Sequence, residues 1–197
     1  TSFEELRQRT LVAKYPWARS DRPPLWIEKL GIDSGGTGNR TSEVYRFALT
    51  DPSRIHATKG ASHSGDLPLH TKRVTYNPPN QGEPPFPVFL TLIDTSYFKD
   101  RLASAIGAKI AIAHPQTGEV TGEFEQWALN SANDPDYNRQ MASEQKVLTR
   151  KPGGRQSEVW MPISSGAANH FWDAEVIQFA MADMARVDLL QPALTAR

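Results

Sequence analysis

The amino-acid sequence predicts an α/β protein, and three features of its 197 residues point to this class. A strand, helix, strand pattern over residues 25–59 is typical of a parallel crossover. The last long segment, Asn169–Leu190, has apolar residues at helical spacing along one face, as in a helix that packs on a sheet. The composition, 39% hydrophobic and 22% charged, is that of a globular protein. At this length we expect a single domain over residues 1–197.

The first third of the chain predicts alternating helices and strands. The expected elements are a helix over 2–15, a strand over 25–32, a helix over 41–49 and a strand over 54–59. Ser2 and Glu5 have capping-box spacing at the start of the first helix. Thr41 or Ser42 is expected to cap the second helix. The first strand ends at Asp33, followed by a glycine turn.

The rest of the chain predicts shorter elements separated by loops. Five of the 15 prolines fall in residues 77–87, which predicts an extended loop without regular strand pairing. Gly107 is expected to end a helix that begins at Thr95 or Ser96. The expected elements after the proline-rich loop are a strand over 88–93, a helix over 95–106, a hairpin over 109–127, a helical segment over 136–145, a basic loop over 146–158, a short strand over 159–160 and the helix over 169–190.

Composition excludes several classes of protein. The absence of cysteine excludes disulfides, thiolate metal sites and thiol nucleophiles. No P-loop pattern occurs, because Gly35-Gly36-Thr37-Gly38 lacks the required lysine. The five histidines lack zinc-ligand spacing, and no apolar run approaches the ~18 residues of a membrane span. We therefore expect a soluble, intracellular protein whose chemistry depends on carboxylates or histidines.

Two carboxylates are candidates for that chemistry. Asp33 is expected at the carboxyl end of a buried strand, where open α/β sheets bind ligands. Asp173 is expected in the first turn of the last helix, next to its apolar face. Such carboxylates can share hard divalent cations. Alternatively, Asp33 caps a turn and Asp173 stabilises the helix dipole.

Basic residues gather in one segment although the chain as a whole is neutral, with 22 basic and 22 acidic residues. Between Arg139 and Arg155 five basic residues accompany one acid, Glu144. The turn Pro152-Gly153-Gly154 would let the side chains project from a mobile loop toward DNA phosphates, or into solvent. The DNA-contact candidates are Lys146, Arg150, Lys151 and Arg155. The proline-rich loop with Tyr76 and Phe86 is a candidate lid or docking surface.

Several ordered blocks resemble a known family. They are Ile32-Asp33-Ser34-Gly35-Gly36, Val44-Tyr45-Arg46-Phe47-Ala48, Lys59-Gly60-Ala61-Ser62, Ile93-Asp94-Thr95, Lys99-Asp100-Arg101-Leu102 and Asn169 to Val176. From about Phe3 to Leu190 the chain resembles the C-terminal nuclease domain of the large terminase subunit of lambda-type tailed phages. The resemblance implies an RNase H-like mixed sheet flanked by helices. It also implies a DNA endonuclease that cuts concatemeric viral genomes during packaging.

The resemblance also implies roles for individual residues. Asp33 and Asp173 would bind Mg²⁺ or Mn²⁺ in a two-metal mechanism. Asp94 is an auxiliary candidate whose competing role is to precede or cap the following helix. Lys59, expected after a strand, would face phosphate or solvent. The family has a further aspartate on a strand before the first helix, in a segment of about three strands that this sequence lacks. Without it we expect weak or no cleavage by this chain alone.

The implied partners are double-stranded viral DNA, the terminase small subunit, the portal protein and the ATPase domain of the same full-length chain, which is absent here. The implied location is the cytoplasm of the bacterial host. Two other hypotheses remain open: a noncatalytic DNA- or portal-binding module derived from a terminase, and another RNase H-like nuclease such as a resolvase.

Overall fold

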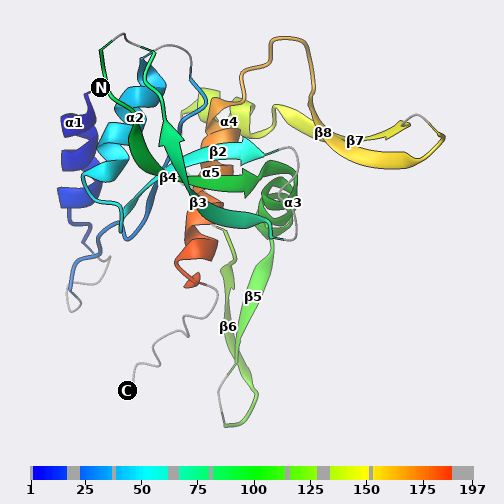
Figure 1. Ribbon diagram of the computed structural model, residues 1–197. Helices are drawn as coiled ribbons and strands as arrows, with labels where there is room; N and C mark the ends of the chain where they lie inside the picture. Colours follow the sequence, from blue (N-terminus) through cyan, green and yellow to red (C-terminus); the bar gives the residue numbers. More distant parts are fainter. Residues whose placement is uncertain are drawn as a thin grey trace. The chain divides into compact units, whose positions relative to one another are not determined.

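The computed structural model describes residues 2–16, 23–36, 39–61, 67–79, 82–113, 116–127, 134–150 and 153–187. Where the sequence predicts one domain, the residues group into two compact units (Figure 1). The first unit contains residues 1–94 and 177–197, and the second contains residues 95–176. Both units contribute to the last helix, which begins in the second unit and ends in the first.

The first unit is built on a four-stranded mixed sheet. Its strands lie in the order β1-β2-β4-β3, with β1, β2 and β4 parallel and β3 antiparallel to β4. The elements are α1 (Phe3–Arg7), the π-helix η1 (Gln8–Val12), β1 (Leu30–Asp33), α2 (Arg40–Leu49), β2 (Ile55–Ala61), β3 (Leu69–Tyr76), β4 (Phe86–Asp94) and the C-terminal part of α5 (His170–Met184). The predicted parallel crossover is confirmed as β1, α2 and β2. A mixed sheet flanked by helices is therefore present.

Helices cover both faces of this sheet. One face packs against α1, η1 and α2 in a core that includes Ile55 and Ala57 of β2, with Leu30 and Ile32 of β1 packed against it. Because side chains alternate along a strand, Gly31 points to the opposite face. There a Cβ at Gly31 would lie 2.5 Å from Ile177 Cγ2 and 3.0 Å from Met181 Cγ of α5. The glycine thus permits α5 to lie close against β1.

For the first unit, the structure confirms some of the predicted helix and strand ends and corrects others. Ser2 caps α1, because its hydroxyl accepts a hydrogen bond from Glu5 N at 3.1 Å. The first strand is shorter than predicted, since β1 begins at Leu30 and Leu25 forms only an isolated bridge with Tyr15. The predicted cap of α2 is wrong, because the helix begins at Arg40. Thr41 instead donates its hydroxyl to the carbonyls of Ser34 and Gly36.

The proline-rich region differs from its prediction at both ends. The strand β3 was not predicted, because its polar sequence lacks a clear apolar alternation and it lies at an edge of the sheet. Pro87 belongs to β4, opposite Thr75 of β3. Proline is tolerated there because β2 pairs with β4 only from Leu90 onward. The rings of Tyr76 and Phe86 pack against each other at 5.5 Å, so they contribute to the core of this unit rather than to a lid.

The second unit combines helices with two separate antiparallel ribbons. Its elements are α3 (Thr95–Ala105), β5 (Lys109–Ala113), β6 (Val120–Glu125), α4 (Pro135–Met141), β7 (Glu144–Arg150), β8 (Gln156–Pro162) and the first turns of α5. The hairpin over 109–127 is confirmed as β5 and β6, and Gly107 follows α3 at φ +76°. The prediction of a basic loop over 146–158 is wrong, because Lys146 to Arg150 pair with β8 in an antiparallel ribbon. The helix α4 ends at Met141, earlier than predicted, because β7 begins at Glu144.

The predicted apolar face of the last helix is largely confirmed. Trp172 and Val176 are buried in the second unit, as are Phe98 and Leu102 of α3. Farther along α5, Phe179 and Ala180 are buried in the first unit. The helix ends at Met184, and Val187 is exposed, while Leu190 lies outside the described residues.

Candidate functional site

Asp33 lies at the carboxyl end of the parallel strand β1, as predicted, and its side chain is exposed. Its Oδ1 accepts a hydrogen bond from Gly35 N at 3.0 Å. The next residue, Ser34, is buried and donates its hydroxyl to the carbonyl of Thr58 at 2.8 Å. These contacts fix the turn after β1. The turn-capping role of Asp33 is therefore present, and it leaves the second carboxylate oxygen for another partner.

Thr58 of β2 is a residue that the sequence analysis did not select. It lies opposite Asp33 in the strand register and is 1% exposed. Its Oγ1 is buried and has no hydrogen-bond partner among the residues that the structure describes. Buried hydroxyls are normally satisfied, by protein or by water. The strand register thus places a buried hydroxyl with no partner among the described residues opposite the exposed Asp33. A further polar group, such as a water molecule, could satisfy this hydroxyl.

The sheet does not bring Asp94 or Lys59 to this place. In the register of the sheet, Asp33 of β1 lies opposite Thr58 of β2, and Thr58 lies opposite Thr91 of β4. Asp94 is therefore three residues beyond that position along β4, and β4 is two strands away from β1. Each of these displacements is about 10 Å. By alternation along their strands, Lys59 and Asp94 also belong to the face opposite that of Asp33.

The surroundings of these two residues match their competing roles. Asp94 immediately precedes α3, the cap position that the sequence offered as an alternative, and its N–H donates to the carbonyl of Pro68. Lys59 is exposed and lies within β2, not after it. Neither residue lies beside Asp33, so their roles in catalysis and DNA contact stay predictions.

Asp173 lies in the first turn of α5, in the second unit, and its side chain is half-exposed. Its Oδ1 is 3.2 Å from Nζ of Lys99 on α3. Lys99 also donates to both carboxylate oxygens of Glu144, at 2.9 Å and 2.7 Å. Asn169 donates its side-chain amide to Glu144 at 2.7 Å. Asp173 is therefore at the outer end of a connected polar cluster, whereas Asp33 belongs to the other unit.

The β7–β8 ribbon, Glu144–Pro162, holds the basic residues predicted to contact DNA. Lys146 lies near its base, 2.9 Å from Asp100 Oδ2 and 3.0 Å from Glu158 Oε2. Hydrogen bonds to these two carboxylates raise the pKa of Lys146. Trp160 donates its indole N–H to Asp100 Oδ1 at 2.8 Å. Asp100 thus ties both strands of the ribbon to α3, and Lys146 does not project from a loop.

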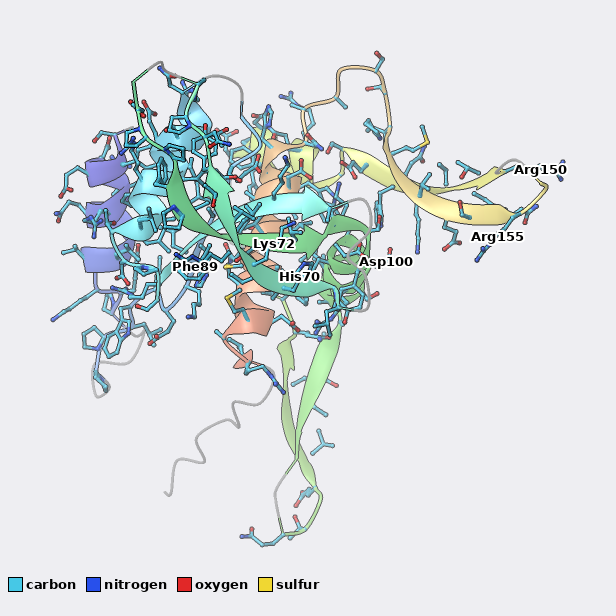
Figure 2. All side chains as sticks on the ribbon, in the orientation of Figure 1. His70, Lys72, Phe89, Asp100, Arg150 and Arg155 are labelled. Carbon is cyan, nitrogen blue, oxygen red and sulfur yellow. The ribbon has the colours of Figure 1, made fainter. Side chains whose placement is uncertain are left out.

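Arg150 and Arg155 lie at the opposite end of the ribbon (Figure 2). Both are exposed, and in the part of the chain that the structure describes neither forms an ion pair. Lys151 lies outside the described residues. At the end of the ribbon near α3, acidic residues therefore neutralise Lys146, whereas the exposed far end carries the positive charges of Arg150 and Arg155.

No group of three or more His, Cys, Asp or Glu residues able to hold a metal occurs within the described ranges. Magnesium does not require such a cage, because it retains several waters and uses one or two carboxylates together with substrate phosphates. The chemistry of Asp33 suits this coordination, since its carboxylate is exposed and its Oδ1 alone accepts the turn hydrogen bond from Gly35 N among the described residues. The residues present therefore fit a hard divalent cation.

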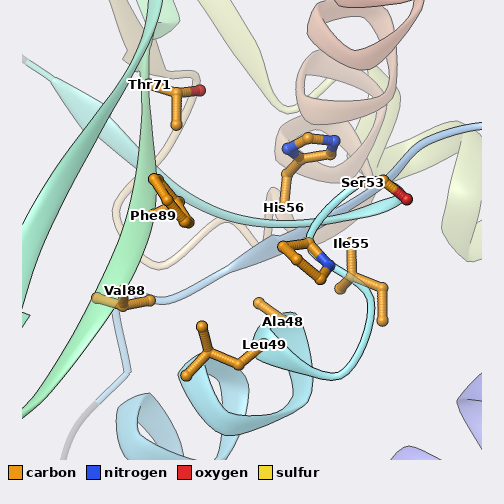
Figure 3. Close-up of a pocket in the computed structure, with 9 residues that line it drawn as sticks. Ala48, Leu49, Ser53, Ile55, His56, Thr71, Val88 and Phe89 are labelled. Carbon is orange, nitrogen blue, oxygen red and sulfur yellow. The ribbon is translucent and has the colours of Figure 1, made fainter.

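A pocket of about 340 Å³ in the first unit lies elsewhere (Figure 3). Its lining is mostly apolar and includes Ile55, His56 and Phe89. Ile55 and His56 are at the amino end of β2, whereas Asp33 is at the carboxyl end of its parallel neighbour β1. The pocket is thus separate from the candidate site. Among the described helices, none has the length and apolar character needed to span a bilayer.

An exposed carboxylate at the carboxyl end of a parallel strand lies where open α/β sheets bind ligands. Residues 2–193 match the model of a family described as terminase large subunit gpA, endonuclease domain, and the chain belongs to this family. No curated protein and no solved structure matches the chain. The chain is thus a phage terminase nuclease module, and viral DNA is the substrate that this family implies.

Proposed function

We propose that this domain is a metal-dependent DNA endonuclease that cuts concatemeric viral DNA during packaging. The observation that carries the proposal is the family match, which spans residues 2–193. The position of Asp33, exposed at the carboxyl end of β1, supports it. An RNase H-like architecture belongs to the same proposal, and the mixed sheet flanked by helices is compatible with it.

Asp33 and Asp173 each contribute carboxylate oxygens to Mg²⁺ or Mn²⁺ in this proposal. Divalent cations supply the Lewis acidity that phosphodiester hydrolysis needs, in a two-metal mechanism. The residues of the chain hold and orient these ligands. Asp33 Oδ1 accepts the turn hydrogen bond from Gly35 N, and Asp173 Oδ1 lies 3.2 Å from Lys99 Nζ.

The ribbon tip supplies positive charge for the DNA backbone. Arg150 and Arg155 are exposed there, and Lys151 lies between them in sequence. Contacts to phosphate oxygens need positive charge without base specificity. Lys59 is a second, separate candidate for such a contact. Lys146 contributes less, because Asp100 and Glu158 already neutralise it.

The domain acts in the cytoplasm of the bacterial host as part of a full-length terminase large subunit. Its partners there are double-stranded viral DNA, the ATPase domain of the same chain, the small subunit and the portal protein.

The test is nicking of supercoiled plasmid by the full-length terminase subunit that contains this domain, with Mg²⁺ or Mn²⁺. We expect Asp33→Asn and Asp173→Asn each to lower the rate by at least about 100-fold, since each replaces a charged carboxylate ligand with a neutral amide. Asp51→Asn is the matched control, because Asp51 lies just before the amino end of β2, where its carboxylate accepts a hydrogen bond from the hydroxyl of the loop residue Ser53. If both variants nick DNA at the rate of the control, the proposed site is wrong.

A noncatalytic DNA- or portal-binding module is the second candidate. The contacts that both aspartates already make, Asp33 with Gly35 N and Asp173 with Lys99, favour it. It predicts salt-dependent DNA binding that the aspartate substitutions leave unchanged and that Arg150→Ala and Lys151→Ala weaken. A resolvase-like nuclease would instead prefer branched DNA, and membership of the terminase family argues against it.

A further inference from the structure

Lys99 joins two carboxylates within the second unit. Its ammonium donates to both oxygens of Glu144 and lies 3.2 Å from Asp173 Oδ1. The three side chains come from α3, β7 and α5, so the contacts connect three elements of the unit. Asn169, just before α5, donates to Glu144 and fixes the far end of the chain of contacts.

Burial decreases along this chain of contacts. The side chain of Glu144 is 5% exposed, that of Lys99 is 11% exposed, and that of Asp173 is 49% exposed. A buried carboxylate requires a partner, and Glu144 has one in Lys99. The ammonium of Lys99 has three N–H donors, and its two bonds to Glu144 leave the third for Asp173. The additional contact with the half-exposed Asp173 contributes little to stability, because ion pairs near solvent are weak.

We propose that Lys99 is a positioning residue that holds the carboxylate of Asp173 in one orientation, and that Glu144 fixes Lys99 for this purpose. The proposal rests on the proposed function, since it assigns the orientation of a residue that would bind metal. It adds two residues to the site that sequence patterns did not select. Residues that orient a metal ligand commonly affect affinity or activity by about 10- to 100-fold.

The first readout is independent of activity. In the 197-residue chain, NMR coupling constants of the Asp173 β-protons measure how strongly one χ1 rotamer is preferred. We expect a single dominant rotamer in the wild-type chain and rotamer averaging in Lys99→Met. Lys109→Met is the matched control, because it removes a lysine from an exposed ion pair with Glu123 in the same unit. An averaged Asp173 in the wild type, or an unchanged rotamer in Lys99→Met, overturns the proposal.

The second readout is the nicking rate of the full-length subunit. We expect Lys99→Met to lower kcat by about 10- to 100-fold with an unchanged KM for DNA, and Lys109→Met to leave both unchanged. If Asp173→Asn abolishes nicking while Lys99→Met has wild-type kcat, this inference fails and the proposed function stands. If Asp173→Asn nicks at the rate of the Asp51→Asn control, the proposed metal-binding role of Asp173 fails, whatever Lys99→Met does.

A third variant separates orientation from folding. Lys99→Met leaves Glu144 buried without its counter-charge, which can unfold the unit. The double variant Lys99→Met with Glu144→Met removes both buried charges, and such replacements are often tolerated. We expect it to fold and still to show the averaged Asp173 rotamer and the low kcat. A folded double variant with a fixed Asp173 rotamer and wild-type kcat overturns the proposal.

Discussion

The close approach of α5 to β1 in the first unit predicts that Gly31→Ala destabilises the protein. A Cβ at this position would lie 2.5 Å from Ile177 Cγ2 and 3.0 Å from Met181 Cγ. Favourable carbon contacts are about 3.5–4.0 Å long, so the helix or the strand must move by about 1 Å. Such overpacking costs about 1–3 kcal/mol. Alanine restricts the unfolded chain and returns about 0.5 kcal/mol, so we expect a net loss of about 0.5–2.5 kcal/mol.

Urea unfolding followed by circular dichroism measures this loss as a lower midpoint with an unchanged m value. For a chain of this size, Tm decreases by about 2–4 °C for each kcal/mol lost. Gly36→Ala is the control, because its Cβ would meet only Arg40 Cβ at 3.5 Å, an ordinary contact. If Gly31→Ala is as stable as Gly36→Ala, then α5 does not pack on β1 and the description of that face of the sheet is wrong.

Three further predictions concern the ribbon and the half-buried His56. Replacing both Arg150 and Arg155 with alanine should reduce the magnitude of the slope of log K for duplex-DNA binding against log salt concentration by about 2. Fluorescence anisotropy measures this slope, and an unchanged slope would exclude the ribbon tip from the DNA contact. Asp100→Ala should speed hydrogen exchange of the β7–β8 amides relative to those of β5–β6, because it removes the acceptor shared by Lys146 and the Trp160 indole; equal protection would show that Asp100 does not anchor the ribbon. Burial, and then the charge of Lys29, lower the pKa of His56 below its ordinary 6.5, so the native state binds fewer protons than the unfolded state. The contribution of neutral His56 to stability is complete above pH 6.5 and decreases as the pH falls. Urea unfolding should therefore show a smaller loss of stability between pH 7 and 5 for His56→Gln than for the wild type. Parallel stability profiles of the two proteins would contradict this prediction.

The elements that the sequence predicted well are those with strong local signals. Ser2 caps α1 through its hydroxyl, and Gly107 follows α3 with a positive φ, so a residue type and its position were sufficient. The β1–α2–β2 crossover followed from apolar periodicity. The strand β3 lacked such a signal, because its residues are mostly polar and half-exposed at the edge of the sheet.

The β7–β8 ribbon shows how tertiary contacts override a local pattern. Basic residues around Pro152-Gly153-Gly154 predicted a loop, and the glycines do adopt positive φ. However, the flanking residues pair in seven registered positions from Glu144 opposite Pro162 to Arg150 opposite Gln156. The anchor of this ribbon is Asp100, more than 40 residues earlier in the chain. No local pattern contains that information.

The candidate site was predicted in part for the same reason. Asp33 was placed correctly at the end of its strand, since strand ends followed by glycine turns have a local signature. Lys99 and Glu144 are separated by 45 positions and become neighbours only in the folded unit. Thr58 is an ordinary strand residue in the sequence, and only the register places it opposite Asp33.

The charge pattern of the second unit limits where DNA can bind it. The total of 22 basic and 22 acidic residues suggested no preference for nucleic acid, but pairing determines which charges remain available. Lys99 and Lys146 each contact two carboxylates, so their charge is already compensated within the unit. Arg150 and Arg155 make no ion pair among the described residues, and they lie together at the ribbon tip. Because phosphate binding depends on uncompensated positive charge, the tip rather than the base of the ribbon is the expected DNA contact.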